Sequence, residues 1–149
     1  MQVWVDADAC PVEIKELLFR AAKRTQIKVT LVANQLMYTP KSNYIDSILV
    51  PAGMNVADRR IVELTEPGDL VVTADIPLAA DVVAKGGQAL NPRGELYTDG
   101  NVGERLAVRN MLDDLRGGGQ IAGGPSNFNA KDKQAFANQL DRWLTKAKR

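Results

Sequence analysis

Four aspartates occupy positions in this 149-residue chain from which they could share one site. Asp6 and Asp8 follow a short apolar run, Asp58 falls in the first turn of a predicted helix, and Asp75 ends a second apolar run. Clustered carboxylates raise one another's pKa and repel, and a divalent cation removes that cost. Because Mg²⁺ and Mn²⁺ prefer oxygen ligands and retain several waters, these four residues form a candidate metal site and candidate catalytic site.

A simpler role exists for three of the four residues when each is taken alone. Asp8 and Asp75 lie just before predicted helices, where a carboxylate is favoured by the helix dipole. Asp58 is three residues after Asn55, the spacing of a capping arrangement. Asp6 has no such explanation, and the four together favour the metal site.

The residue types that are missing narrow the chemistry. The chain has no histidine, which excludes Ser-His, Cys-His and His-metal catalysis. A metal-bound water can attack a phosphodiester without histidine, and two metal ions could hold the attacking and leaving oxygens. The single cysteine, Cys10, excludes an internal disulfide, and we interpret it as a small buried thiol.

Substrate-binding candidates surround the aspartates in the sequence. Arg59 adjoins Asp58, and Arg105 and Arg109 share one face of a predicted helix. We expect Arg59 and Arg105 to contact phosphates, and Asn34 and Thr73 to orient the acidic groups or bound water. For any one of these cations a solvated surface position is the alternative, and the same holds for the remaining candidates, Lys41, Arg60 and Arg93.

Composition indicates an ordinary globular protein. The 45% hydrophobic and 25% charged fractions are typical of soluble domains, and the length suits a single domain spanning 1–149. No apolar run approaches the roughly 18 residues of a membrane-spanning helix. The first residues lack the basic start of a signal peptide, so we expect a cytoplasmic protein. A net charge of +1 means that nucleic acid would have to bind a local patch.

Strand and helix patterns alternate along the chain, which predicts parallel strands joined by right-handed crossovers. We therefore expect an α/β fold, a three-layer α/β/α sandwich with a mainly parallel sheet of about five strands. Ligands of such sheets bind outside the carboxyl ends of the strands, where the aspartates are expected. Predicted strands are 3–5, 27–33, 45–50, 70–74, 88–91 and a hairpin strand at 95–97; predicted helices are 11–24, 55–64, 77–85, 101–116 and 131–148, with a glycine-rich loop at 117–129.

Several segments resemble one known family. They are DADACPV at 6–12, ADRRIVE at 57–63, GDLVVTADIPLA at 68–79, NPRGELYT at 91–98 and NVGERLAVRNMLDDLR at 101–116. Together they are similar to the bacterial YaiI/YqxD family of uncharacterised proteins, which resembles the PIN-like nuclease superfamily in fold. The resemblance implies that Asp6, Asp58 and Asp75 fill the acidic places of a PIN domain and that Thr73 fills the T of its T-x-D motif. Many PIN domains have a further acid after that motif, where this chain has Ile76 and Pro77.

The leading hypothesis is a Mg²⁺- or Mn²⁺-dependent nuclease or phosphodiesterase acting on RNA. One alternative is a phosphatase of the haloacid-dehalogenase type, because Asp6-x-Asp8 resembles its nucleophile and acid pair. That alternative requires a later acidic pair at the same edge, whereas Asp69 and Asp75 are predicted at opposite ends of one strand. The other alternative is a non-catalytic module that binds nucleic acid or protein.

Overall fold

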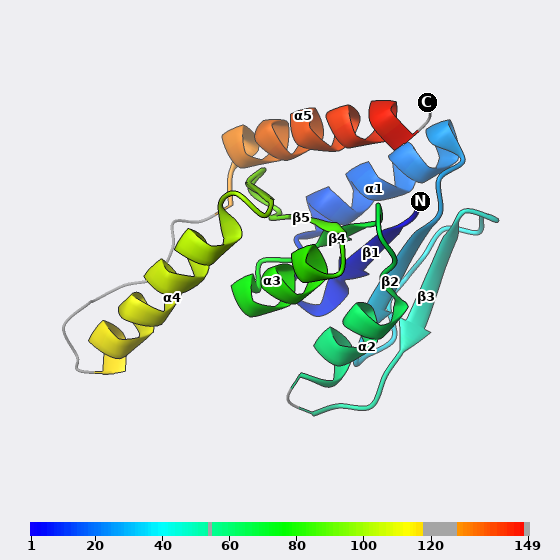
Figure 1. Cartoon of the computed structure of the whole chain (residues 1–149). Coiled ribbons are helices and arrows are strands. Elements are labelled where there is room, and N and C mark those ends of the chain that lie inside the picture. Colours follow the sequence, from blue (N-terminus) through cyan, green and yellow to red (C-terminus); the bar gives the residue numbers. More distant parts are fainter. Residues whose placement is uncertain (54, 118–127, 148–149) are drawn as a thin grey trace.

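A single six-stranded sheet organises the chain in the computed structural model, which describes residues 1–53, 55–117 and 128–147 (Figure 1). The strand order is β3-β2-β1-β4-β5-β6, with every neighbouring pair parallel except the antiparallel pair β5 and β6. The strands are β1 (Val3–Asp6), β2 (Val29–Ala33), β3 (Ile45–Leu49), β4 (Leu70–Val72), β5 (Gln88–Leu90) and β6 (Leu96–Tyr97). The helices are η1 (Ala7–Ala9), α1 (Val12–Thr25), α2 (Val56–Leu64), α3 (Ile76–Ala84), α4 (Val102–Gly117) and α5 (Ala130–Ala147).

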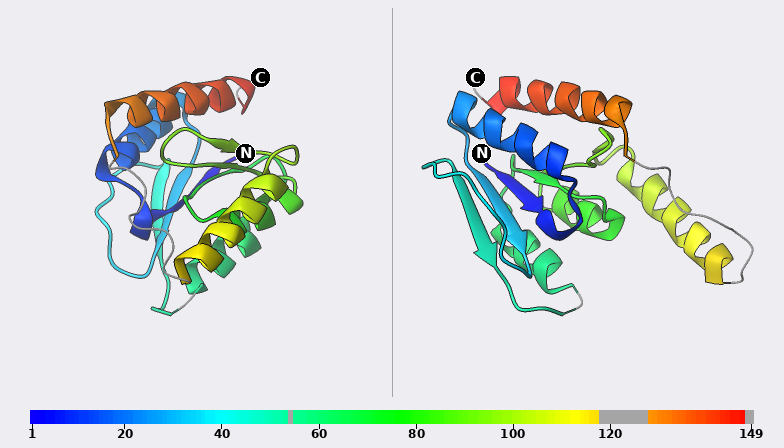
Figure 2. Two further views of the ribbon diagram at one scale, coloured as in Figure 1. Left: turned by 90° about the vertical axis from the view of Figure 1, so that its left-hand side faces the viewer. Right: turned by 180° about the vertical axis from the view of Figure 1, so that it is seen from behind.

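Helices cover both faces of the sheet, which explains why the central strands are apolar without alternation. Val3 and Val5 of β1 face the core beneath α1 and α5, whereas Trp4 faces the core beneath α2 and α3. The views in Figures 1 and 2 show the same layering, with α1 and α5 together on one side of the sheet and α2 and α3 on the other. The predicted three-layer α/β/α fold is confirmed.

The larger of the two cores joins the first and last helices of the chain. Ile14 and Leu18 of α1 and Phe136 and Leu140 of α5 are at most 3% exposed and pack against the same sheet face. Full burial of such a side chain is worth about 1.5–3 kcal/mol. The apolar face of the last helix is therefore a packing surface.

A buried aspartate fixes the end of the sheet at which the parallel strands begin. Asp69, 3% exposed, precedes β4, and its carboxylate accepts hydrogen bonds from the backbone N–H groups of Gln2 and Glu66 and from the Trp4 indole, each at 3.0 Å. Buried charge is tolerated when hydrogen bonds replace its lost hydration. These bonds tie the start of β1 to the start of β4 at the amino end of the strands.

One helix stands apart from the layers. The first turn of α4 packs against α3, through Val102, but the helix then projects away from the body of the molecule (Figure 2). Three apolar side chains of α4, Val108, Met111 and Leu115, are 38–55% exposed. The predicted helix is present, yet these three apolar side chains are not buried by any part of the chain that the structure describes.

Strands β2 and β4 are shorter than predicted, because residues at their ends belong to turns. The second strand begins at Val29, not 27, because Gln26 ends α1 in the left-handed region at φ 59° and the next residues complete the reversal. The strand predicted at 70–74 ends at Val72, since Thr73 turns its hydroxyl to the backbone of Asp75. The short helix η1 was not predicted, and the sheet has six strands rather than about five.

Two further predictions concern the start of α2 and the loop that precedes α5. Asn55 is the N-cap residue of α2, as predicted, but it has φ 63° and its side chain makes no capping hydrogen bond. Most of the predicted glycine-rich loop at 117–129 lies outside the described residues. Among the helices that the structure describes, none combines the length and apolar character needed to cross a membrane.

Candidate functional site at the carboxyl edge of the sheet

The strand order reverses direction between β1 and β4. From β1 the chain builds outward to β2 and β3 on one side, and β4 leads to β5 on the other. In open parallel sheets the crevice at such a reversal, outside the carboxyl ends of the strands, is the usual binding site. Asp6 is the last residue of β1, and Thr73 and Asp75 directly follow β4, so all three lie at this crevice.

Thr73 links the two strand ends. Its side chain is buried, and its hydroxyl donates to Asp6 Oδ2 at 3.0 Å while accepting the backbone N–H of Asp75 at 3.0 Å. Asp75 in turn caps α3, because its Oδ1 accepts the backbone N–H of Leu78 at 3.0 Å. The capping role considered for Asp75 is therefore real, and it holds the carboxylate in place at the crevice.

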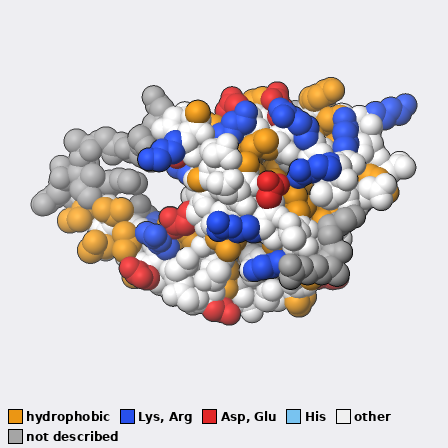
Figure 3. Space-filling model, turned by 90° about the horizontal axis from the view of Figure 1, so that it is seen from above, with side chains coloured by type: hydrophobic (Ala, Val, Ile, Leu, Met, Phe, Trp, Pro, Cys, Tyr) orange, Lys and Arg blue, Asp and Glu red, His pale blue; other side chains and the backbone are white. Residues whose placement is uncertain are grey.

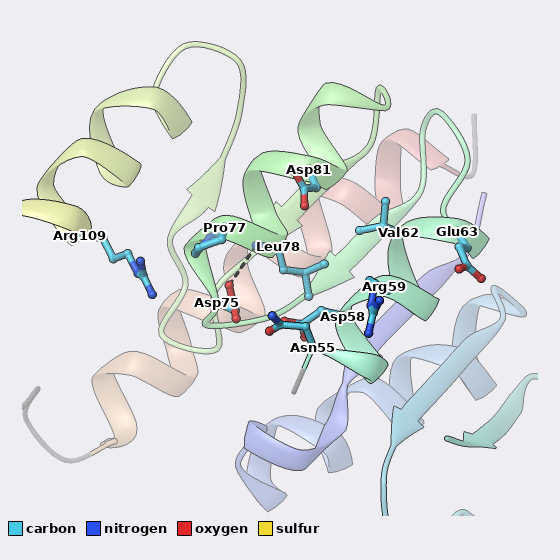
Figure 4. A pocket seen from close by; sticks show the side chains of 10 residues that line it. All are labelled: Asn55, Asp58, Arg59, Val62, Glu63, Asp75, Pro77, Leu78, Asp81 and Arg109. Atoms are coloured by element: carbon cyan, nitrogen blue, oxygen red, sulfur yellow. Dashed lines mark hydrogen bonds between the residues drawn. The ribbon is translucent and has the colours of Figure 1, made fainter. Parts of the chain in front are cut away.

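Asp58 reaches the same place from α2. Its pKa is raised from 3.8 to about 6, mainly by burial, and further by the charges of Asp75 and Asp6, by a side-chain hydrogen bond with Asp75 and by the charge of Asp81. A hydrogen bond between two carboxyl groups requires that one of them hold a proton. Figure 4 shows Asp58 and Asp75 facing each other across the crevice from α2 and from the start of α3.

The electrostatics of Asp6 follow the same pattern. Burial raises the pKa of Asp6 above its usual value, the hydrogen bond from Thr73 lowers it, and the charges of Asp75 and Asp8 raise it again. Three carboxyl groups from segments far apart in the sequence therefore interact electrostatically. We call Asp6, Asp58 and Asp75 the acidic centre.

Asp8 lies at the margin of the acidic centre. Its side chain is exposed, and its Oδ2 accepts the backbone N–H of Asn34 at 2.9 Å. Asn34 therefore acts on Asp8 through its main chain, and the bond ties the loop after β2 to η1. Asp8 affects the acidic centre through its charge on Asp6.

A pocket of about 720 Å³ opens beside Asp58 and Asp75. Arg59 stands on its α2 wall, and Arg109 extends toward it from α4 (Figure 4). Asp81 of α3 also lines the pocket. The lining is completed by Asn55, Val62, Glu63, Pro77 and Leu78.

The two helical arginines have different surroundings from those expected. Arg105 Nε is paired with Glu95 Oε1 at 2.8 Å, and the residue does not line the pocket. Arg109, four residues later on the same helix, does line it. Their shared helical face was visible in the sequence, but which of the two meets the pocket depends on how α4 sits against α3.

The donor set of the acidic centre suits a hard cation. Its side chains offer only carboxylate oxygens, and their mutual repulsion is the cost that a divalent ion would remove. Within the described ranges, no three acidic or cysteine side chains are close enough to enclose a metal ion on their own. Mg²⁺ is often held by one or two carboxylates together with waters and substrate phosphates, so the residues fit such an ion.

Two other titratable residues stand outside the chemistry of the crevice. Burial raises the pKa of the Cys10 thiol to about 12, so it stays protonated and is no nucleophile at neutral pH. Asp69 lies at the opposite edge of the sheet, with both carboxylate oxygens engaged by N–H donors.

Comparison with known proteins identifies the family. Residues 4–146 match the family described as "Uncharacterized BCR, YaiI/YqxD family". The chain belongs to the YaiI/YqxD family. It is 60% identical over 146 residues to a UPF0178 protein of Janthinobacterium sp. (strain Marseille), covering 98% of this chain and 97% of that protein. It is 57% identical over 149 residues to UPF0178 protein ECA0873 of Pectobacterium atrosepticum, covering 100% and 99%.

The YaiI/YqxD match includes the whole acidic centre, since Asp6, Asp58 and Asp75 all fall within residues 4–146. No solved structure matches the chain. The match confirms the resemblance of the sequence segments to the YaiI/YqxD family.

Proposed function

We propose that this YaiI/YqxD protein is a metal-dependent phosphodiesterase that cleaves RNA. The observation that carries the proposal is the meeting of Asp6, Asp58 and Asp75 at the reversal point of the sheet, with the pKa of Asp58 raised to about 6. A set of carboxyl groups that repel one another is expected where a cation offsets the repulsion. The resemblance to PIN-like nucleases points to the same residues.

Each residue of the crevice has a defined task in this proposal. Asp6, Asp58 and Asp75 would hold Mg²⁺ or Mn²⁺, directly or through water, and Thr73 keeps the Asp6 carboxylate in one orientation. When bound, the ion supplies an activated water and charge stabilisation for phosphodiester hydrolysis. Arg59 and Arg109 would contact the phosphate oxygens, since both line the pocket beside the acids.

Hydrogen bonding of Asp69 favours a phosphodiesterase over the haloacid-dehalogenase alternative. That alternative needs a later acidic pair at the carboxyl edge. Asp69 is 3% exposed at the amino edge, where the Trp4 indole and two backbone N–H groups occupy its carboxylate. A beryllofluoride adduct trapped on Asp6 would nevertheless support the phosphatase.

The direct test is cleavage of a labelled single-stranded RNA by the full chain in Mg²⁺ or Mn²⁺, compared with Asp6→Asn and Asp75→Asn. We expect each substitution to lower the rate at least about 100-fold, because each removes an oxygen ligand from the ion. Asp141→Asn is the matched control, since Asp141 is an exposed partner of Arg24 on the surface. Equal rates in all four proteins would refute the proposal. RNA binding without metal-dependent cleavage would instead favour the non-catalytic module.

A further inference from the structure

A second hollow lies on the other side of the acidic centre, between α1 and the segment that follows β2. It has a volume of about 370 Å³. We call it the α1 groove, and its walls include Lys15, Phe19 and Arg20 of α1 together with Met37, Tyr38 and Pro40 of the loop. Nothing in the phosphodiesterase proposal uses these residues.

Apolar and aromatic side chains are exposed at this groove. Phe19 forms part of its wall at 9% exposure, whereas Tyr38 is 83% exposed. The neighbouring Leu36 is 88% exposed and Val12, also on the groove wall, is 61% exposed. Exposed apolar side chains that gather in one patch, rather than singly, are typical of interaction surfaces.

The charge around the groove is positive. Lys15 and Arg20 line it beside one acid, Glu16, and neither cation is ion-paired with any residue that the structure describes. Arg20 also lines a hollow between α1 and α5, and each of these helices carries four Lys or Arg against two Asp or Glu. Figure 3 shows Lys and Arg side chains spread across the face formed by α1 and α5. An aromatic hollow beside a basic face is complementary to a polyanion that carries flat rings.

The groove is joined to the acidic centre through Asp8. The loop that supplies Tyr38 begins at Asn34, whose N–H donates to Asp8 Oδ2 at 2.9 Å. Helix α1 begins at Val12, separated from the end of η1 by two residues. The pocket of Arg59 and Arg109 lies on the α2 and α3 side of the sheet, whereas the groove lies on the α1 side. A chain laid across the carboxyl edge would therefore pass from the pocket, over the acidic centre, into the groove.

We propose that the α1 groove binds an unpaired nucleobase of a single-stranded nucleic acid, with Tyr38 stacking on the base and Lys15 and Arg20 contacting the adjoining phosphates. A base within a duplex is already stacked on both faces, so only a single strand offers a free face to the ring. That the scissile phosphodiester lies at the acidic centre rests on the proposed function. The groove's affinity for a single strand does not depend on cleavage.

The test measures binding apart from catalysis. The full chain is titrated, in EDTA, against a fluorescent single-stranded RNA of about ten nucleotides, within the usual site size for such proteins. We expect Tyr38→Ala to weaken binding about 5- to 100-fold, as loss of one stacked base does elsewhere, and Tyr38→Phe to retain it within about twofold. The matching DNA strand tests whether the sugar matters, and a duplex of the same sequence should bind more weakly and be insensitive to Tyr38.

Salt dependence separates the contribution of the cations from that of stacking. Lys15→Gln should reduce the slope of log affinity against log salt by about 0.7, the value for one phosphate contact on a single strand. Lys146→Gln is the matched control, because Lys146 lies beside Leu70 and Gln88, the first residues of β4 and β5, at the opposite edge of the sheet. Equal slopes for the two variants would count against a phosphate contact at Lys15 and overturn that part of the proposal.

The outcomes distinguish this inference from the proposed function. If Tyr38→Ala loses affinity while no metal supports cleavage, the groove is a nucleic-acid site and the phosphodiesterase proposal fails. If cleavage depends on Asp6 and Asp75 but affinity is the same in Tyr38→Ala and the unaltered chain, the groove proposal fails alone. If Tyr38→Ala converts a dimer to a monomer in sedimentation and leaves RNA affinity unchanged, the groove is a self-association surface and the proposal is overturned.

Discussion

Replacing Asp58 by asparagine should make the folded chain more stable at neutral pH, although it removes a group of the acidic centre. In the folded chain the Asp58 pKa is raised from 3.8 to about 6 by burial and by the neighbouring carboxylates. The folded state therefore binds this proton more tightly than the unfolded state does. Its free energy of unfolding falls as the pH rises from about 4 to about 6, and the whole loss is present above about pH 7. An asparagine has no charge to lose over this range.

The size of the effect follows from the shift. A rise of about two pKa units corresponds to at most about 3 kcal/mol. Solvent screening at this half-buried position reduces the expected gain for Asp58→Asn to about 1–2 kcal/mol at pH 7.5. For a chain of this length that is an increase in Tm of about 3–6 °C. At pH 4 the two proteins should differ by less than about 0.5 kcal/mol.

Urea denaturation in EDTA at pH 4, 5, 6 and 7.5 measures the difference directly. Asp141→Asn serves as the control, because its exposed ion pair with Arg24 is worth little and should show no comparable pH dependence. Adding Mg²⁺ at pH 7.5 should then stabilise the unaltered chain more than the variant, since the ion binds only the folded acidic centre. An Asp58→Asn protein that is equally or less stable at pH 7.5 would refute the account of repelling carboxyl groups.

Three further substitutions test other contacts. Thr73→Val should lower the free energy of unfolding by about 1–3 kcal/mol in urea titrations, because a buried hydroxyl that serves two partners is lost; an unchanged midpoint would contradict this. Arg109→Ala should raise the KM for RNA about tenfold, whereas Arg105→Ala should change it less than about twofold because Arg105 is paired with Glu95. The reverse ranking would support the sequence-based prediction that Arg105 contacts phosphate. Asp69→Ala should lower the free energy of unfolding by about 3–5 kcal/mol in the same titrations, since it leaves the Trp4 indole N–H and two backbone N–H groups without their acceptor. A loss below about 1 kcal/mol would show that these hydrogen bonds are unimportant for stability.

Local sequence patterns were sufficient to predict the framework and part of the candidate site. Apolar runs and helical stripes gave the strands and helices, and the alternation of the two gave the parallel sheet with helices on both faces. From that topology, the position of Asp6 after β1 and of Asp75 after β4 places them at one edge. The same reasoning places Asp69 at the other edge, as the structure has it.

The remaining features depend on how helices are placed relative to one another. Asp81 lies in the middle of α3, and only the packing of α2 beside α3 brings its charge close enough to raise the pKa of Asp58. Arg109 lines the pocket because α4 leaves the body at a particular angle to α3, which helical periodicity does not encode. The α1 groove likewise arises where α1 meets the loop after β2, so neither segment alone indicates a hollow at Tyr38.

Asp69 and Asp58 have opposite electrostatic surroundings, and this contrast bears on function. Asp69 is buried among three N–H donors, the arrangement expected of an acid kept for the stability of the fold. Asp58 is instead placed against Asp75, Asp6 and Asp81, and each of these charges opposes its ionisation. A fold that can satisfy one buried carboxylate so completely has no structural need for the second arrangement. A bound cation would offset the repulsion among these carboxyl groups and make the cluster at the reversal point of the sheet favourable.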